Sequence, residues 1–171
     1  MKKNKFPPLF IGGTGCCGTT LLVDLIGLHP DISPIYETGF VIVLINIFNT
    51  DKYKNTTFEE KKEIYLNYIY NWSKNLPHRP DSKRGYERYV HGPHHICFDR
   101  KYIRNITENF LNKLSPLNYN KLVPDYLKSL FNEHTRIDKK KYWISKKPLY
   151  ILYLPLILNW FPENLWSKTG N

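Results

Sequence analysis

The first thirty residues alternate short apolar runs with glycine and proline breaks. "PLFIGG", at residues 8–13, is an apolar run that ends at glycine, which is typical of a buried strand. In "GTTLLVDLIGLHP", at 18–30, the apolar residues follow helical spacing until Pro30 ends the pattern. These residues are Leu21, Leu22, Leu25, Ile26 and Leu28. The pattern predicts a strand, a glycine-rich loop and a helix in succession.

Residues 51–141 are polar, basic and rich in Tyr and Asn, and they are predicted to be a helical region. Thr57 and Glu60 have the spacing of a capping box. Apolar residues then follow on one helical face, namely Phe58, Tyr65, Ile69 and Trp72. The prolines at 77 and 80 break the pattern, and "HGPHH" at 91–95 predicts a loop. A second helix is predicted from the spacing of Ile103, Ile106, Phe110 and Leu114. A third is expected from about Pro124 to Glu133.

The segment after this helical region returns to an apolar pattern. "KYWISKKP", at 141–148, predicts a second strand, and "LYILYLPLILNWFP" predicts a short helix that restarts at Pro155. A strand and a helix, an inserted helical region, and again a strand and a helix indicate an α/β fold. We therefore expect one domain over residues 1–171, with a parallel sheet flanked by helices.

Composition and charge narrow the choice of partner and compartment. The formal net charge of +10 favours an anionic partner, which could be a phosphorylated or sulfated small molecule, a nucleic acid or a membrane surface. The three cysteines, at 16, 17 and 97, do not form a disulfide framework, and the N-terminus lacks the apolar core of a signal peptide. The apolar run at 40–48 is too short to span a membrane. We expect a cytoplasmic protein without a membrane span.

The loop "GGTGCCGTT", at 12–20, has the glycine frame of a phosphate-binding loop. Gly13 and Gly18 are five apart, and Thr20 stands where a magnesium-binding hydroxyl would lie. However, Thr19 replaces the lysine that compensates the charge of the β- and γ-phosphates. The loop therefore suits a smaller anion, such as a single 5′-phosphate. A strand-to-helix turn that binds nothing remains the alternative.

Two segments at the ends of the chain resemble one enzyme family. "PPLFIGGTGCCGTTLL…LIGLHPDISPIYETGF" and "WISKKPLYILYLPLILNWFP" are similar to sulfotransferases that use 3′-phosphoadenosine 5′-phosphosulfate (PAPS). The similarity is greatest to the bacterial and tyrosylprotein-type branch. There, a strand leads into a G-x-[RK]-[SC]-G-T-[TS]-L loop, followed by "HPD", a glutamate and a "W-x-x-K-[ST]-P" segment. The fold implied is a P-loop-like parallel sheet, with residues 51–141 on the acceptor side.

The resemblance implies a role for each matching position. The loop would wrap the 5′-phosphosulfate of PAPS through Gly13, Thr14, Gly15, Cys16, Cys17, Gly18, Thr19 and Thr20. Glu37 would be the general base that accepts the proton of the acceptor hydroxyl. Lys146 or Lys147 would lie near the cofactor, and no metal is expected. The acceptor would be a hydroxyl group of a carbohydrate, a peptide or a small molecule. His29 is expected to terminate the first helix.

Two departures from the family pattern bear on activity. Cys16 replaces an arginine or lysine that stabilises charge on the sulfuryl group, and such a loss typically costs about 10²- to 10³-fold in rate. The family's "RDxR" strand and turn do not follow "FPEN" at 161–164, so we expect a truncated N-terminal portion with an incomplete sheet. A noncatalytic remnant, or an anion- or nucleotide-binding protein of the same fold, is the main alternative. Nucleic-acid binding is less favoured because no recognised motif accompanies the basic residues.

Overall fold

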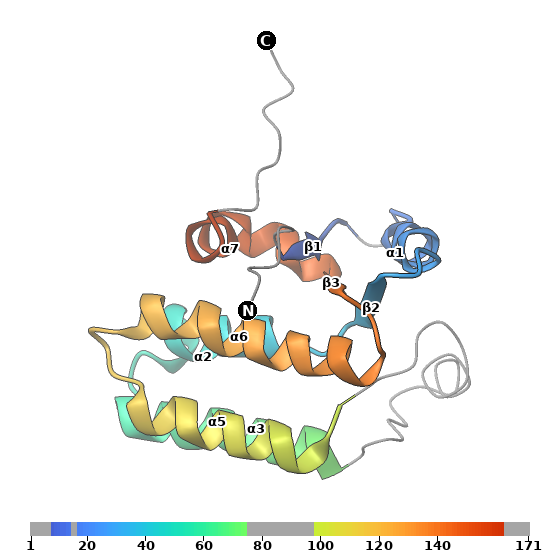
Figure 1. Ribbon diagram of the computed structural model, residues 1–171. Helices are drawn as coiled ribbons and strands as arrows, with labels where there is room; N and C mark the ends of the chain where they lie inside the picture. Colours follow the sequence, from blue (N-terminus) through green and yellow to red (C-terminus); the bar gives the residue numbers. More distant parts are fainter. Residues whose placement is uncertain (1–7, 15–16, 75–97, 163–171) are drawn as a thin grey trace.

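A small parallel sheet organises the protein. The computed structural model describes residues 8–14, 17–74 and 98–162. Its sheet has three strands in the order β1-β3-β2, and both neighbours of β3 run parallel to it (Figure 1). The strands are β1 (Leu9–Ile11), β2 (Ile32–Tyr36) and β3 (Tyr142–Lys146). The expectation of an α/β fold with a parallel sheet flanked by helices is confirmed.

Strand β2 was not assigned by the sequence pattern, because Pro34 interrupts it. A proline cannot donate to a hydrogen-bond ladder, so within sheets it is confined to edge strands and bulges. β2 is an edge strand, and its Pro34 lies opposite Ile144 of β3. β3, which has no proline, occupies the centre of the sheet and pairs on both sides.

Helix α1 (Thr19–Gly27) follows the glycine-rich loop and packs on β2 and β3. The predicted strand, loop and helix are therefore confirmed. However, most of the apolar residues that predicted the helix do not lie on its buried face. Val23 is fully buried against Tyr36 and Ile144, with Ile26 beside them. The predicted leucines face outward and are exposed, namely Leu21, Leu22, Leu25 and Leu28. Helical periodicity located the helix but did not identify which side of it meets the sheet.

The helical region lies on the other side of the sheet. It consists of η1 (Asp51–Tyr53), α3 (Phe58–Lys74), α5 (Arg100–Lys113) and α6 (Tyr119–Ile137), and it is preceded by α2 (Phe40–Asn49), which packs against α3. Helix α6 packs directly on β2 and β3, and α5 packs against α6 and α3 (Figure 1). The apolar run at 40–48 is the buried helix α2. The predicted loop at 91–95 and the prolines at 77 and 80 lie outside the described residues.

The capping box and the first two predicted helices of this region are confirmed. The backbone N–H of Thr57 donates to Glu60 Oε2 at 2.7 Å, and the Glu60 N–H donates back to Thr57 Oγ1 at 3.3 Å. The third predicted helix is longer than expected. It begins at Tyr119, five residues before the predicted start, so Pro124 lies inside it. The predicted start near Pro124 was therefore wrong, because the helix continues through the proline despite the lost hydrogen bond and the crowding of the Asn120 carbonyl.

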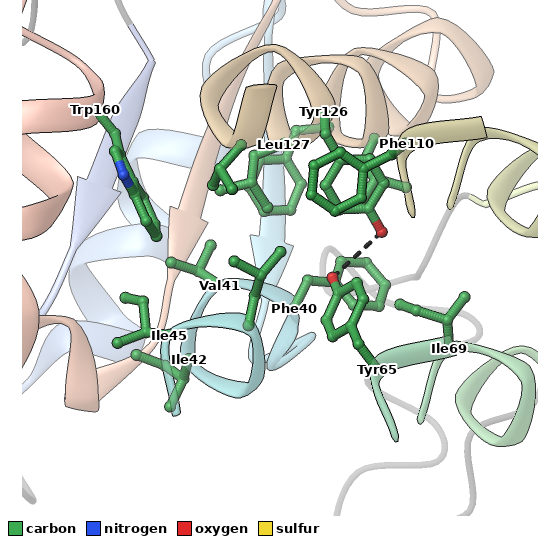
Figure 2. Close-up of a cluster of buried hydrophobic side chains, with 14 of the residues drawn as sticks. Phe40, Val41, Ile42, Ile45, Tyr65, Ile69, Phe110, Tyr126, Leu127 and Trp160 are labelled. Carbon is green, nitrogen blue, oxygen red and sulfur yellow. Dashed lines mark hydrogen bonds between the residues drawn. The ribbon is translucent and has the colours of Figure 1, made fainter. Parts of the chain in front are cut away.

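Aromatic side chains dominate the core between these helices (Figure 2). Phe110 stacks on Tyr126 with ring centroids 4.1 Å apart and planes 8° apart. The Tyr126 hydroxyl lies 3.2 Å from the hydroxyl of Tyr65 and 2.9 Å from Thr107 Oγ1. Burial raises the pKa of Tyr126, so its phenol stays protonated and can satisfy these contacts. These three buried hydroxyl groups thus satisfy one another.

The final predicted helix forms in two parts. The 3₁₀ helix η2 (Pro148–Tyr153) follows β3, and α7 (Leu154–Trp160) continues from it with Pro155 in its first turn. This confirms the predicted restart. None of the helices in the described ranges, 8–14, 17–74 and 98–162, is long and apolar enough to cross a membrane.

Candidate functional site

The three parallel strands end at one row of the sheet. Ile11 at the end of β1 and Tyr36 at the end of β2 both pair with Lys146 at the end of β3. Ligands of open α/β sheets bind outside this carboxyl edge. The glycine-rich loop, Glu37 and Lys147 leave the sheet from this row. The segments singled out in the sequence therefore converge there.

Glu37 lies directly after β2 and contacts Lys146 of β3 and Lys147, which follows β3. Its backbone N–H donates to the Lys146 carbonyl at 2.9 Å. Its carboxylate forms a close ion pair with Lys146 Nζ, and its Oε2 lies 3.8 Å from Lys147 Nζ. The structure therefore brings together the three predicted catalytic residues.

The two lysines differ in their surroundings. Side chains alternate along a strand, so Lys146 shares the α1 side of β3 with Ile144. The Lys146 side chain is 4% exposed, and Glu37 satisfies its ammonium group. Lys147 is 21% exposed, and its backbone N–H donates to the Ile11 carbonyl at 3.0 Å. Two cations against one carboxylate leave a net positive charge at the edge, which suits an anionic ligand.

The glycine-rich loop is tied to the segment that follows β3. The Gly13 N–H donates to the Pro148 carbonyl at 3.0 Å, so this N–H is already occupied. A β-carbon at Gly13 would lie 2.5 Å from the Cys17 sulfur, and the glycine therefore allows the loop to turn tightly. Thr14 and Cys17 are exposed, whereas Gly15 and Cys16 lie outside the described residues. Donors to an anion would come from positions after Gly13.

Helix α1 begins at this loop with a bare N-terminus. Gly18 is the N-cap in the left-handed conformation, with φ 77°, and no side chain caps the helix. The first bond of the helix runs from the Leu22 N–H to the Gly18 carbonyl at 3.0 Å. The N–H groups of Thr19 and Thr20 therefore precede any intrahelical acceptor and carry the positive end of the helix dipole. This end has no acidic residue in its first turn.

The turn after Glu37 contains residues that the sequence analysis missed. Tyr68, on α3, donates its hydroxyl hydrogen to the Thr38 carbonyl at 2.6 Å. Gly39 follows in the left-handed conformation with φ 78°. The buried Thr38 hydroxyl has no hydrogen-bond partner within the part of the chain that the structure describes. A glycine such as that in "ETGF" is the residue type that a left-handed turn favours, but no sequence signal points to Tyr68.

His29 and Asp31 lie away from this edge of the sheet. The His29 N–H donates to the Ile26 carbonyl at 3.0 Å, and its Nδ1 accepts from the Asp31 N–H at 3.1 Å, as expected for a residue that terminates α1. Asp31 pairs with Lys141 before β3, at the amino edge of the sheet. No group of three or more His, Cys, Asp or Glu side chains in the described ranges could hold a metal ion.

Comparison with known proteins agrees with this arrangement. The profile described as the sulfotransferase family matches residues 7–165, which include the loop, Glu37 and both lysines. Comparisons with the curated proteins and with the solved structures give no significant match. The match spans most of the chain, from before β1 to beyond α7. The chain belongs to the sulfotransferase family.

Proposed function

We propose that this protein transfers a sulfuryl group from PAPS to a hydroxyl group of an acceptor. The observation that supports this most is the meeting of Glu37, Lys146 and Lys147 at the carboxyl edge, beside the loop that leads into α1. The family supports sulfuryl transfer in general. The choice of PAPS, and of a carbohydrate, peptide or small-molecule acceptor, rests on the resemblance of the loop and of the "WISKKP" segment.

In this proposal the loop and α1 hold the donor. PAPS supplies an activated sulfuryl group, and its 5′-phosphosulfate would lie against the N–H groups of Thr19 and Thr20. The hydroxyls of both threonines add donors at the same helix end. Gly13 would shape the turn rather than donate, because Pro148 already accepts its N–H.

Glu37 is the proposed general base. Its side chain is 39% exposed, so an acceptor hydroxyl can approach it, while Lys146 fixes its orientation from the buried side. The acceptor oxygen forms a bond to sulfur as the bond from sulfur to the bridging oxygen breaks, and the hydroxyl proton passes to the carboxylate. Lys147 is the more exposed cation, and we assign it to the negative charge of the donor.

The loop substitution favours a second candidate function. Cys16 provides no positive charge, and Lys146 is already committed to Glu37. The uncharged Cys16 and the pairing of Lys146 with Glu37 would both fit a protein that binds the nucleotide but transfers the sulfuryl group slowly or not at all. Residues 51–141 would then still form the acceptor side, and their assignment, like the cytoplasmic location, stays a prediction.

Nucleotide binding and transfer can be tested separately. Adenosine 3′,5′-bisphosphate titrated to millimolar concentration should shift the amide resonances of residues 17–20, and Lys147→Met should weaken that binding. Lys141→Met is the matched control, because Lys141 pairs with Asp31 at the opposite edge of the sheet. If neither the loop amides nor the affinity responds, the loop is only a turn and the proposal fails.

Transfer itself is tested by single turnover with labelled PAPS and a set of simple hydroxyl acceptors. Cys16→Arg should raise the rate, and the gain should disappear in a Glu37→Gln background if this carboxylate is the base. If both the natural chain and Cys16→Arg bind the nucleotide but neither transfers the sulfuryl group, the noncatalytic alternative is favoured.

A further inference from the structure

We propose that Tyr68 is a positioning residue, which holds the Glu37–Gly39 turn and so fixes the carboxylate at the edge of the sheet. The inference deepens the proposed function and rests on it for its catalytic consequence. Tyr68 lies on α3, about thirty residues along the chain from the turn that it contacts. It therefore connects the helical region to the candidate site.

The turn needs to be held, because its backbone is unfavourable. Glu37 has φ 43° and Gly39 has φ 78°, so two of three consecutive residues lie in the left-handed region. For a residue with a β-carbon, such as Glu37, this conformation costs roughly 1–2 kcal/mol. A strained conformation of this kind persists only where the surrounding contacts determine it.

Contacts from two different parts of the molecule support this conformation here. The Glu37 N–H bonds to the Lys146 carbonyl, and the Glu37 carboxylate pairs with the Lys146 ammonium group. Both of these contacts come from β3 and act on Glu37 itself. The contact from Tyr68 acts two peptide groups further along, on the Thr38 carbonyl at 2.6 Å, in the peptide that joins Thr38 to Gly39. Tyr68 thus restrains the Thr38–Gly39 end of the turn, whereas Lys146 restrains the Glu37 end.

Gly39 is matched to this contact. A β-carbon at Gly39 would lie 2.6 Å from the Tyr68 hydroxyl oxygen, so the tyrosine occupies the space that the glycine leaves. The Tyr68 ring is itself held in place by an edge contact with Phe40, with ring centroids 6.5 Å apart, and by Tyr65 at 6.2 Å. The hydroxyl is therefore presented by a rigid aromatic group rather than by a mobile side chain.

A direct test is the hydrogen exchange of the Glu37 amide in the full chain. Tyr68→Phe removes only the hydroxyl group, and we expect exchange at Glu37 to become about tenfold faster through local opening of the turn. Tyr65→Phe is the matched control, because it removes a hydroxyl from the same helix that contacts Tyr126 rather than the turn. The Leu127 amide in α6 reports any global loss of stability. Equal exchange at Glu37 in Tyr68→Phe and the natural chain would overturn the proposal.

The catalytic consequence is measured by the same pair of variants. Tyr68→Phe should lower the single-turnover rate roughly tenfold and leave the donor affinity unchanged, because the base is misplaced while the loop is intact. Tyr65→Phe should keep its rate within about twofold. A natural chain that transfers nothing would contradict the proposed function, whereas the exchange measurement would still decide whether Tyr68 holds the turn. An unchanged rate in Tyr68→Phe with active natural protein would overturn the catalytic part.

Discussion

The two sides of the sheet are packed very differently. On the helical side, α6 and the helices behind it bury a continuous cluster of aromatic and aliphatic side chains (Figure 2). On the other side, α1 covers the sheet with one small cluster around Val23, Tyr36 and Ile144. The outer face of α1 leaves Leu25 57% exposed and Leu28 75% exposed. Most of the apolar burial that stabilises the domain thus lies on the helical side.

The candidate site lies where these two sides meet. The proposed anion-binding part consists of backbone groups of the loop and of α1, on the lightly packed side. The proposed base, Glu37, belongs to a turn that the helical side contacts through Tyr68. Backbone donors need little burial to point at a ligand, whereas a strained turn needs a rigid support. The difference in packing therefore follows the different demands of the two halves of the site.

The largest expected effect comes from truncating one apolar side chain on each side of the sheet. Phe131 is fully buried and contacts Trp143 with ring centroids 4.7 Å apart, so Phe131→Ala should cost about 3–5 kcal/mol of unfolding free energy. Leu25→Ala on α1 should change it by less than about 0.5 kcal/mol. Urea denaturation measures both. A cost above about 1.5 kcal/mol for Leu25→Ala would mean that this face of α1 is covered in solution.

The ion pair at the boundary should respond asymmetrically to the loss of either partner. Glu37→Gln leaves the buried ammonium group of Lys146 without its carboxylate, and we expect a loss of about 1–3 kcal/mol. Lys146→Met leaves Glu37, which is half-exposed and can be hydrated, so its cost should be below about 1 kcal/mol. Urea denaturation at pH 7 gives both values. The opposite ranking would contradict the burial difference between the two groups.

A smaller effect should link the turn to α3. Gly39→Ala places a β-carbon in a left-handed position and 2.6 Å from the Tyr68 hydroxyl, so it should destabilise the protein. In a Tyr68→Phe background the nearest remaining atom of the ring is 3.7 Å away, and the cost of Gly39→Ala should fall by about 1 kcal/mol. A double-mutant cycle measures this coupling. Additive effects would show that the glycine is required for its backbone conformation alone.

Local patterns predicted the elements that need no information about their neighbours. The strand before the loop, the capping box at Thr57 and the periodic helices α3 and α5 follow from short-range rules. Strand β2 was missed because Pro34 is acceptable only at an edge, and position in the sheet is not a local property. The exposure of the α1 leucines was missed for the same reason, because periodicity cannot show which face of a helix packs against another element.

The sequence predicted the parts of the candidate site that local motifs mark. Glu37 and the two lysines were found from their motifs, and strand pairing explains why they meet. Side-chain alternation in β3 decides which of the two lysines pairs closely with Glu37. The answer is known only when the structure shows that β3 ends at Lys146. The contact of Tyr68 depends on how α3 packs, so no short motif could have identified it.

The smallest predicted effect concerns the exposed side chain of Glu60 in the capping box at the start of α3. Hydrogen bonds from the Thr57 hydroxyl and backbone lower the pKa of Glu60 below its usual value of 4.5. The group therefore contributes stability above its unfolded pKa, and this contribution is lost as the pH falls through the lower folded pKa. We expect the natural chain to be slightly more stable than Glu60→Gln at pH 7, and the difference to shrink as the pH falls below 4.5. Thr57→Ala should shrink the difference at pH 7, because it removes the strongest of the bonds to the carboxylate. Urea denaturation of the four variants from pH 7 to pH 3 measures the cycle, and a difference that does not shrink as the pH falls would show that charge at Glu60 is not what stabilises this helix end.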